Sequence, residues 1–203
     1  MTELELRSPV RHIATHPESY VDELVARAQA GDTAAFGALY DEYAPRVYRY
    51  LSARLSQQAD AEDLLHRVFV KMIESIGRYR PTGTPFGAWL FRIARNAMID
   101  ELRARPRDVA IDVIDAISPG GSSDPVGAAE REAERDEIRG ALAELTEEQR
   151  EVILYRFFAG LTTHETATLM GKREGSIRAL QFRALQSLRR RLGTGPDRLR
   201  SAS

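Results

Sequence analysis

The chain has 203 residues, of which 43% are hydrophobic and 29% are charged, and its formal net charge is −1. This composition is typical of a protein that folds around a core, and the length is enough for one or two small domains. The absence of cysteine excludes disulfides and thiolate metal sites. No apolar run reaches the ~20 residues that span a bilayer, and residues 1–16 lack the hydrophobic core of a signal peptide. We therefore expect a cytoplasmic protein.

Helix signals are abundant in the first half of the chain, and strand signals are scarce. Residues 18–30 are predicted to form a short helix that Gly31 ends, and Asp32 is a favourable N-cap for the next helix. That second helix is expected to reach about Leu55, with Pro45 either kinking it or starting a new one.

Two further helices are predicted before the middle of the chain. Asp60 is expected to start the first of them, and an apolar series at helical spacing follows it: Leu64, Leu65, Val68, Phe69, Met72 and Ile73. A long helix is predicted over residues 84–105, with Thr84 as its cap and Pro85 in its first turn. Its buried face is expected to hold Phe86, Leu90, Ile93, Ala94, Ala97, Met98 and Leu102.

Composition divides the chain into two parts. Residues 107–129 are rich in serine, glycine, proline and aspartate, and are predicted to be a flexible acidic linker. Residues 18–106 form one predicted helical domain after a flexible tail of residues 1–17, and residues 130–193 form a second one, followed by a tail of residues 194–203. The expected fold is therefore all-α, with two small helical domains and a helix-turn-helix in the second.

The second domain carries the strongest local signals. Thr146 with Gln149, and Thr162 with Glu165, have the spacing of capping boxes, in which each side chain satisfies a free backbone amide of the other residue. A turn at Gly171 is predicted to lead into a basic helix over residues 174–192. Its inward residues are expected to be Ile177, Leu180, Ala184, Leu185, Leu188 and Leu192.

The basic helix has the character of a DNA-reading element. Residues 172–200 hold nine Lys or Arg against two acidic residues, so a local basic patch exists in spite of the net charge. Arginine bonds two acceptors of a guanine, and polar side chains read other base edges. The residues expected to face DNA are Arg173, Glu174, Ser176, Arg178, Phe182 and Arg183. The alternative is a plain helical hairpin with a solvated charged face.

The long helix over residues 84–105 is a second basic element. Its exposed face is expected to carry Arg92, Arg95, Asn96, Asp100 and Arg103. Trp89 and the loop residue Tyr79 are aromatic and can stack on unpaired bases. The alternative for Trp89 is core packing, which its spacing with Phe86 and Ile93 slightly favours.

Signs of catalysis or metal binding are missing from the sequence. Asp60 and Asp63 lie at a predicted helix start, where the helix dipole favours anions, so capping is preferred over acid–base chemistry. The four histidines are scattered, and no nucleophile–base pair or glycine-rich phosphate loop is evident. We expect no cofactor, no metal and no enzymatic activity.

Taken together, these motifs resemble bacterial RNA polymerase sigma factors of the extracytoplasmic-function class across roughly residues 20–193. Three stretches carry the resemblance: Asp60–Ile73 (DAEDLLHRVFVKMI), Phe86–Arg105 (FGAWLFRIARNAMIDELRAR), and Leu142–Arg191 with its LTEEQREVILYRF segment and helix-turn-helix. Two stretches depart from the family pattern. His66 and Arg67 replace a common Gln and acidic residue, and residues 177–181 read IRALQ, so Leu180 is expected inward and Gln181 outward.

The resemblance implies three binding surfaces. The first domain is implied to dock on the β′ clamp helices of core polymerase through Tyr48, Leu51, Asp60, Asp63, Leu64, Leu65 and Phe69. It is also implied to bind and open the −10 promoter element through Tyr79, Arg80, Trp89, Arg92, Arg95, Asn96, Asp100 and Arg103. The basic helix of the second domain is implied to read the −35 element, through the six residues named above.

The resemblance also implies partners. They are core RNA polymerase, including its β flap, promoter DNA, and in many family members an anti-sigma protein, with the free chain a monomer. A conventional helix-turn-helix regulator remains the alternative, although no dimerisation helix is evident. A helical adaptor with merely solvated basic faces is a further alternative.

Overall fold

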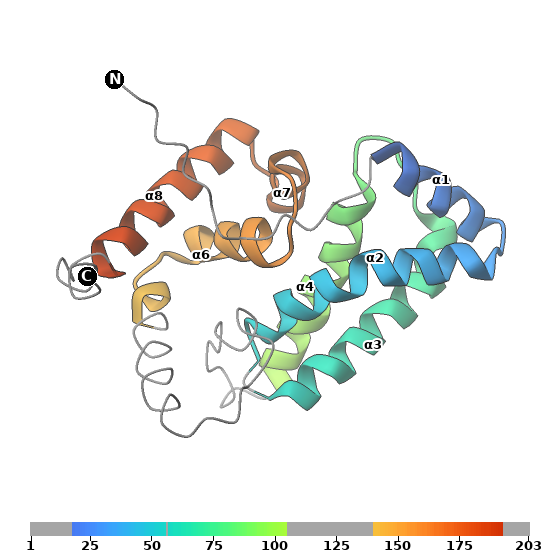
Figure 1. The fold of residues 1–203 in the computed structure, drawn as a ribbon, viewed down its shortest axis with the longest axis horizontal. Helices are drawn as coiled ribbons and strands as arrows, with labels where there is room; N and C mark the ends of the chain where they lie inside the picture. Colours follow the sequence, from blue (N-terminus) through green and yellow to red (C-terminus); the bar gives the residue numbers. More distant parts are fainter. Residues whose placement is uncertain (1–17, 56, 105–139, 193–203) are drawn as a thin grey trace, which may run out of the picture.

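A computed structural model describes residues 18–55, 57–104 and 140–192 (Figure 1). The described chain is helical and contains no strand, which confirms the all-α prediction. Its first half forms α1 (Glu18–Gln29), α2 (Thr33–Ser52), α3 (Gln58–Ser75), a 3₁₀ turn (Ile76–Arg78) and α4 (Phe86–Ala104). The predicted tails and linker, Arg105, and residues 130–139 of the predicted second domain lie outside the described residues.

The junction between α1 and α2 follows the local signals. Gly31 has a φ of +89°, a conformation that favours glycine. Asp32 then caps α2, since its carboxylate accepts the backbone N–H groups of Ala34 at 2.9 Å and Ala35 at 3.3 Å. The prediction that Pro45 starts a new helix is wrong, because α2 runs through it and ends at Ser52 rather than Leu55.

The starts of α3 and α4 differ from the predictions. The helix α3 begins at Gln58, with Gln57 in the cap position and no side-chain cap bond, so Asp60 lies in the first turn and is not the cap. The helix α4 begins at Phe86, and the carbonyl of the preceding Pro85 accepts the N–H of Trp89 at 3.0 Å. Thr84 is therefore one residue too early to cap α4.

The second half of the described chain contains the helix-turn-helix. A helix ends at residue 143, and Leu145 lies just beyond it. There follow α6 (Glu147–Ile153), a π-helical turn (Leu154–Phe158), α7 (Thr163–Met170) and α8 (Glu174–Leu192). Both capping boxes are present, and Gly171 ends α7 with a φ of +63°. The predicted bounds of the basic helix are confirmed.

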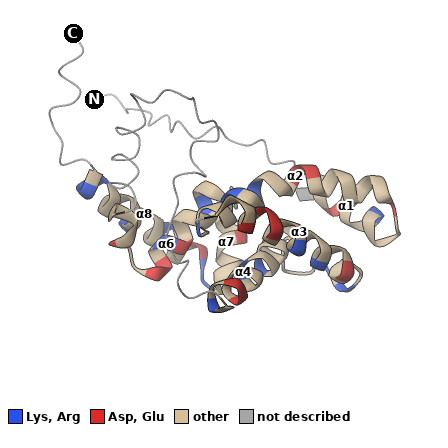
Figure 2. Ribbon diagram, turned by 90° about the horizontal axis from the view of Figure 1, so that it is seen from below, with Lys and Arg blue, Asp and Glu red and all other residues tan. Residues whose placement is uncertain are grey.

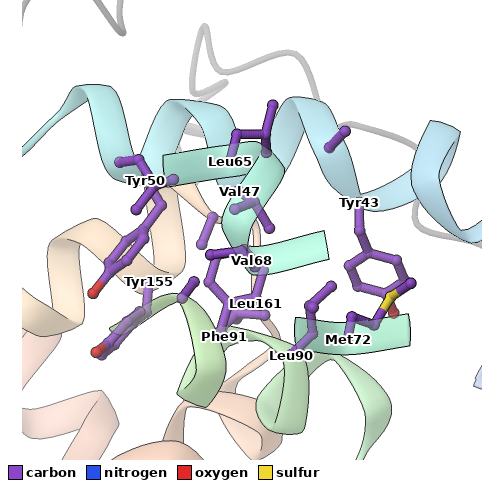
Figure 3. Packing of buried hydrophobic residues seen from close by; sticks show 14 of the residues in the cluster. Tyr43, Val47, Tyr50, Leu65, Val68, Met72, Leu90, Phe91, Tyr155 and Leu161 are labelled. Carbon is purple, nitrogen blue, oxygen red and sulfur yellow. The ribbon is translucent and has the colours of Figure 1, made fainter. Parts of the chain in front are cut away.

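The two halves share one hydrophobic core. Helix α7 contacts α4, as Figure 1 also shows, and the π-helical turn contacts α2. Tyr50 of α2 lies beside Tyr155 of the π-helical turn, with ring centroids 5.4 Å apart and an interplanar angle of 20° (Figure 3). Leu161 is fully buried in the same cluster as Phe91 of α4. The described parts of the two predicted domains are thus packed together, which the sequence had not indicated.

Candidate nucleic-acid interface

The helix-turn-helix presents α8 on the surface of the second half. The N–H of Lys172 reaches back to the carbonyl of Ala167 at 2.9 Å, which closes the turn at Gly171 and redirects the chain. Ile177, Leu180 and Ala184 face inward, whereas Leu192 is 39% exposed, so the prediction that Leu192 faces inward is wrong. Leu185 and Leu188 are half-buried against the main core.

The opposite face of α8 is free of such packing. Arg173, Ser176, Arg178 and Arg183 are exposed. Phe182 is 65% exposed, which is unusual for a phenylalanine. Figure 2 shows further basic residues at the end of α8, where Arg189, Arg190 and Arg191 form its last turn.

Several of these polar groups already have partners. The guanidinium of Arg178 donates to the carboxylate of Glu174 at 2.8 Å, and His164 lies 3.3 Å from the same residue. Gln181 is half-buried and accepts a hydrogen bond from Arg156 at 3.2 Å, so it does not face fully outward as expected. The inward position of Leu180 is confirmed, because only 8% of it is exposed.

A second polar face lies on α4. Arg92, Asn96, Asp100 and Arg103 are all exposed, and their spacing of three or four residues places them on one side of the helix. Arg95 lies on a neighbouring side, and its Nε donates to Glu151 Oε1 of α6 at 3.0 Å. Burial opposes ionisation of Arg95 and is the largest single effect, but the hydrogen bond and charge of Glu151, together with the nearby Tyr155 and Tyr50, raise the arginine's pKa overall. The structure therefore separates Arg95 from the other four residues.

The aromatic pair beside α4 is mostly packed into the core. Tyr79 is only 4% exposed, and its hydroxyl donates to the carbonyl of Thr84 at 2.8 Å. Its ring lies 5.0 Å from that of half-buried Trp89. The expectation that Tyr79 offers an open stacking face is wrong, because its ring fills the space between the loop and α4. Arg80, next in the chain, is exposed.

The residues assigned to polymerase docking are largely internal. Leu51 and Leu64 are fully buried, and Leu65 and Phe69 are 8% and 5% exposed. Those four assignments are corrected: the side chains hold α2 and α3 together, because the inward stripe of α3 packs on α2. The three polar or aromatic members are accessible, with Asp63 exposed and Tyr48 and Asp60 half-buried.

The exposed apolar residues nearby were missed as candidates. Val70 and Ile73 of α3 are each 53% exposed, and Tyr40 of α2 is 38% exposed. The ring of Tyr40 lies 4.7 Å from that of Phe69, so it continues the surface of α3. We call Tyr40, Val70 and Ile73 the α2–α3 apolar patch. Val70 falls outside the inward stripe of α3, which is the signal that could have identified it.

The described residues show neither a metal cluster nor a membrane-spanning helix. Residues 18–55, 57–104 and 140–192 contain no group of three or more His, Asp or Glu side chains that could hold a metal ion. None of the helices in these ranges is long and apolar enough to cross a membrane.

Both halves of the chain match models of known protein families. Residues 39–107 match the family model Sigma-70 region 2, and residues 141–190 match Sigma-70, region 4. The helical fold, the helix-turn-helix and these two matches define a sigma factor.

Similar proteins of known class show which group of sigma factors the chain belongs to. The chain is 39% identical over 173 residues to the ECF RNA polymerase sigma factor BldN of Streptomyces coelicolor, covering 84% of this chain and 65% of BldN. It is 35% identical over 178 residues to the ECF RNA polymerase sigma factor ShbA of Streptomyces griseus subsp. griseus, covering 83% and 93%. The solved structure of CnrH in complex with the cytosolic domain of CnrY matches with a TM-score of 0.60 and 25% identity, covering 85% of this chain and 97% of CnrH. The chain belongs to the extracytoplasmic-function (ECF) sigma factors.

Proposed function

We propose that this chain works in the cytoplasm as a non-catalytic, alternative initiation factor that directs core RNA polymerase to promoters and helps to open them. The observation that carries the proposal is the presence, in one chain, of two separate polar helix faces suited to DNA, one on α4 and one on α8. A conventional helix-turn-helix regulator needs only the second. The domain limits proposed are residues 18–106 and 130–193, joined by the linker over residues 107–129.

The face of α8 is proposed to read the −35 element in the major groove. Arg178 and Arg183 can each bond guanine or phosphate, and the exposed Phe182 can contact a thymine methyl group. Glu174 holds Arg178 in the described arrangement, so the pair must separate if Arg178 is to bond a base. Arg173 and Ser176, at the start of the helix, complete the surface.

The face of α4 is proposed to hold the −10 element. Arg92 and Arg103 suit phosphates, and Asn96 suits a base edge. Opening base pairs is unfavourable, and stacking of an unpaired base on an aromatic ring returns ~1–3 kcal/mol. The half-buried Trp89 is the ring available for this, and Tyr79 supports it from the core. Arg80, which follows Tyr79 in the chain, is exposed.

The α2–α3 apolar patch is proposed to dock on the β′ clamp helices. Apolar side chains exposed on a monomer commonly mark a protein contact, and Asp63 supplies a charge beside them. The second domain is proposed to contact the β flap. A protein inhibitor is also proposed, because CnrH was solved with the cytosolic domain of CnrY.

Run-off transcription with core polymerase from the organism that encodes the chain tests the proposal. Promoter fragments from that genome should give specific transcripts only when the protein is added. Arg178→Ala should reduce these transcripts about tenfold or more, since a bidentate arginine–guanine contact is worth ~1–3 kcal/mol. Arg27→Ala, which removes an exposed arginine of α1, should leave them unchanged.

The variant Ile73→Asp tests polymerase docking separately from DNA recognition. It should weaken binding to core polymerase, while Ala26→Asp, with the same charge added at an exposed site on α1, should not. DNA binding by the protein alone, with no polymerase complex, would refute the proposal and favour a conventional regulator.

A further inference from the structure

We infer that Gln29 of α1 is a positioning residue for the −10 element: it fixes the loop of residues 79–85, and through that loop the surroundings of Trp89. The inference rests on the proposed function, because it concerns the part of the chain proposed to hold an unpaired base. It gives a role to α1, which carries none of the residues assigned to DNA.

The side-chain amide of Gln29 bridges two carbonyls on the path from α3 to α4. Its Nε2 donates to the carbonyl of Ile76 at 2.8 Å and to that of Tyr79 at 2.9 Å, which lie 47 and 50 residues further along the chain. A side-chain amide nitrogen carries two N–H donors, so these bonds use both of them. Gln29 therefore ties the end of α1 to the 3₁₀ turn and to the start of the loop.

Two side chains of the loop itself complete its hydrogen bonding. The Nη1 of Arg80 donates to the carbonyls of Gly77 and Tyr79, both at 2.9 Å. The carbonyl oxygen of Tyr79 thus accepts from Gln29 and from Arg80, one donor for each lone pair. At the other end, the Tyr79 hydroxyl donates to the carbonyl of Thr84 at 2.8 Å. These bonds close the loop on itself, and Gln29 attaches it to a separate helix.

The tip of the loop depends on such bonds because it has little packing. Residues 80–83 are all exposed, whereas Tyr79 and Phe86 at the two ends are 4% and 2% exposed. The rings of these end residues lie 5.0 and 5.4 Å from the ring of Trp89. A shift of the Tyr79 backbone would therefore move the tip of the loop and one wall of the Trp89 site together.

Loss of the Gln29 bonds should release the loop while the helices stay folded. Gln29 is itself exposed, so its side chain adds little to the core. A hydrogen bond between neutral groups favours the bonded state by about fivefold, so the loss of two favours release by roughly 25-fold. Exposed segments with few apolar contacts open locally, without unfolding of the remaining structure.

The fluorescence of Trp89, the only tryptophan, tests the tie in the free full-length protein. Gln29→Met keeps the length of the side chain and removes both donors. It should increase quenching by acrylamide and shift the emission to longer wavelength, because the Tyr79 wall moves away from the indole ring. Gln58→Met is the matched control, since the Gln58 amide bonds only to Glu62 of its own helix, at 2.7 Å. Unchanged quenching in Gln29→Met would overturn the tie between α1 and the loop.

Promoter opening tests the positioning role. Core polymerase with each variant is placed on a promoter fragment that the unchanged protein transcribes, and permanganate detects the unpaired thymines. Gln29→Met should lower this reactivity about fivefold or more, and should leave the affinity for core polymerase unchanged. The control Gln58→Met should leave both unchanged.

The remaining outcomes separate this inference from the proposed function. Increased quenching with normal opening would show that the loop does not position DNA, and an equal loss of polymerase affinity would show that Gln29 only supports the fold. Either result would overturn the inference. If the unchanged protein transcribes no promoter fragment, the proposed function fails, and the fluorescence of Gln29→Met still decides whether Gln29 holds the loop.

Discussion

Replacing Arg46 with alanine should lower the free energy of unfolding by more than any surface change. The side chain is 2% exposed, donates to two carbonyls and neutralises Glu42. Hydrogen bonds to a charged group contribute ~1.5–3 kcal/mol each, and removing one member of a buried ion pair costs ~3–5 kcal/mol. These contributions overlap, so we expect a loss of about 3–5 kcal/mol.

Urea unfolding followed by two signals can measure this loss and locate it. Ellipticity at 222 nm reports on all helices, and the fluorescence of Trp89, the only tryptophan, reports on the first half. With a slope of ~1–3 kcal/mol per molar urea, the midpoint of Arg46→Ala should fall by about 2 M. The two signals should coincide in the unchanged protein, since the halves share a core, and should separate in the variant.

The control is Arg27→Ala. Arg27 has 48% of its side chain exposed and pairs with Asp32 within the first half, so its loss should cost within ~1 kcal/mol. An Arg46→Ala midpoint within roughly 0.3 M of the starting protein would refute the argument. Coincident signals in Arg46→Ala would show that the arginine does not couple the halves.

Two further predictions concern helix ends. Thr162→Ala removes the hydroxyl that accepts the N–H of Glu165 at 3.1 Å, and should lower the unfolding free energy by ~1 kcal/mol; an unchanged thermal midpoint would count against the capping box. The bond from Arg27, with the backbone bonds of the cap, lowers the pKa of Asp32 below its ordinary value of 3.8. A lowered pKa in the folded state means that the carboxylate stabilises the fold above pH 3.8 and loses this effect as the pH falls through the folded value. The difference in thermal midpoint between the protein and Asp32→Ala should therefore be constant near neutral pH and shrink below pH 3.8, and a constant difference at lower pH would contradict the assignment.

The parts of the fold that the sequence predicted best are those determined by neighbouring residues. The bounds of α8, both capping boxes and the turns at Gly31 and Gly171 depend on residues within one or two helical turns, so the local pattern is sufficient. The cap of α4 was missed by one residue because Thr84 and Pro85 are both acceptable near a helix start, and local preference alone does not choose between adjacent registers.

The parts that were missed depend on contacts distant in sequence. Nothing near Arg46 indicates that it is buried, because its two acceptors lie 113 and 114 residues away. The same reason explains why some polymerase-docking residues were assigned wrongly. An apolar stripe shows that a helix has a buried side, but not which apolar residues lie outside that side. The resemblance assigned Leu64, which is buried, to docking, and Val70, which is exposed, was overlooked.

The stacked tyrosines make the contact between the two halves weaker than its aromatic area suggests. The hydroxyls of Tyr50 and Tyr155 are buried and have no hydrogen-bond partner of good geometry among the described residues. A buried hydroxyl without a partner costs ~1–3 kcal/mol, and water would satisfy both groups once the halves part. Phenylalanine at either position would keep the ring contact and lose this penalty. The two tyrosines therefore specify how the halves meet. Their buried hydroxyls also lower the free energy that a binding partner must supply to separate the halves.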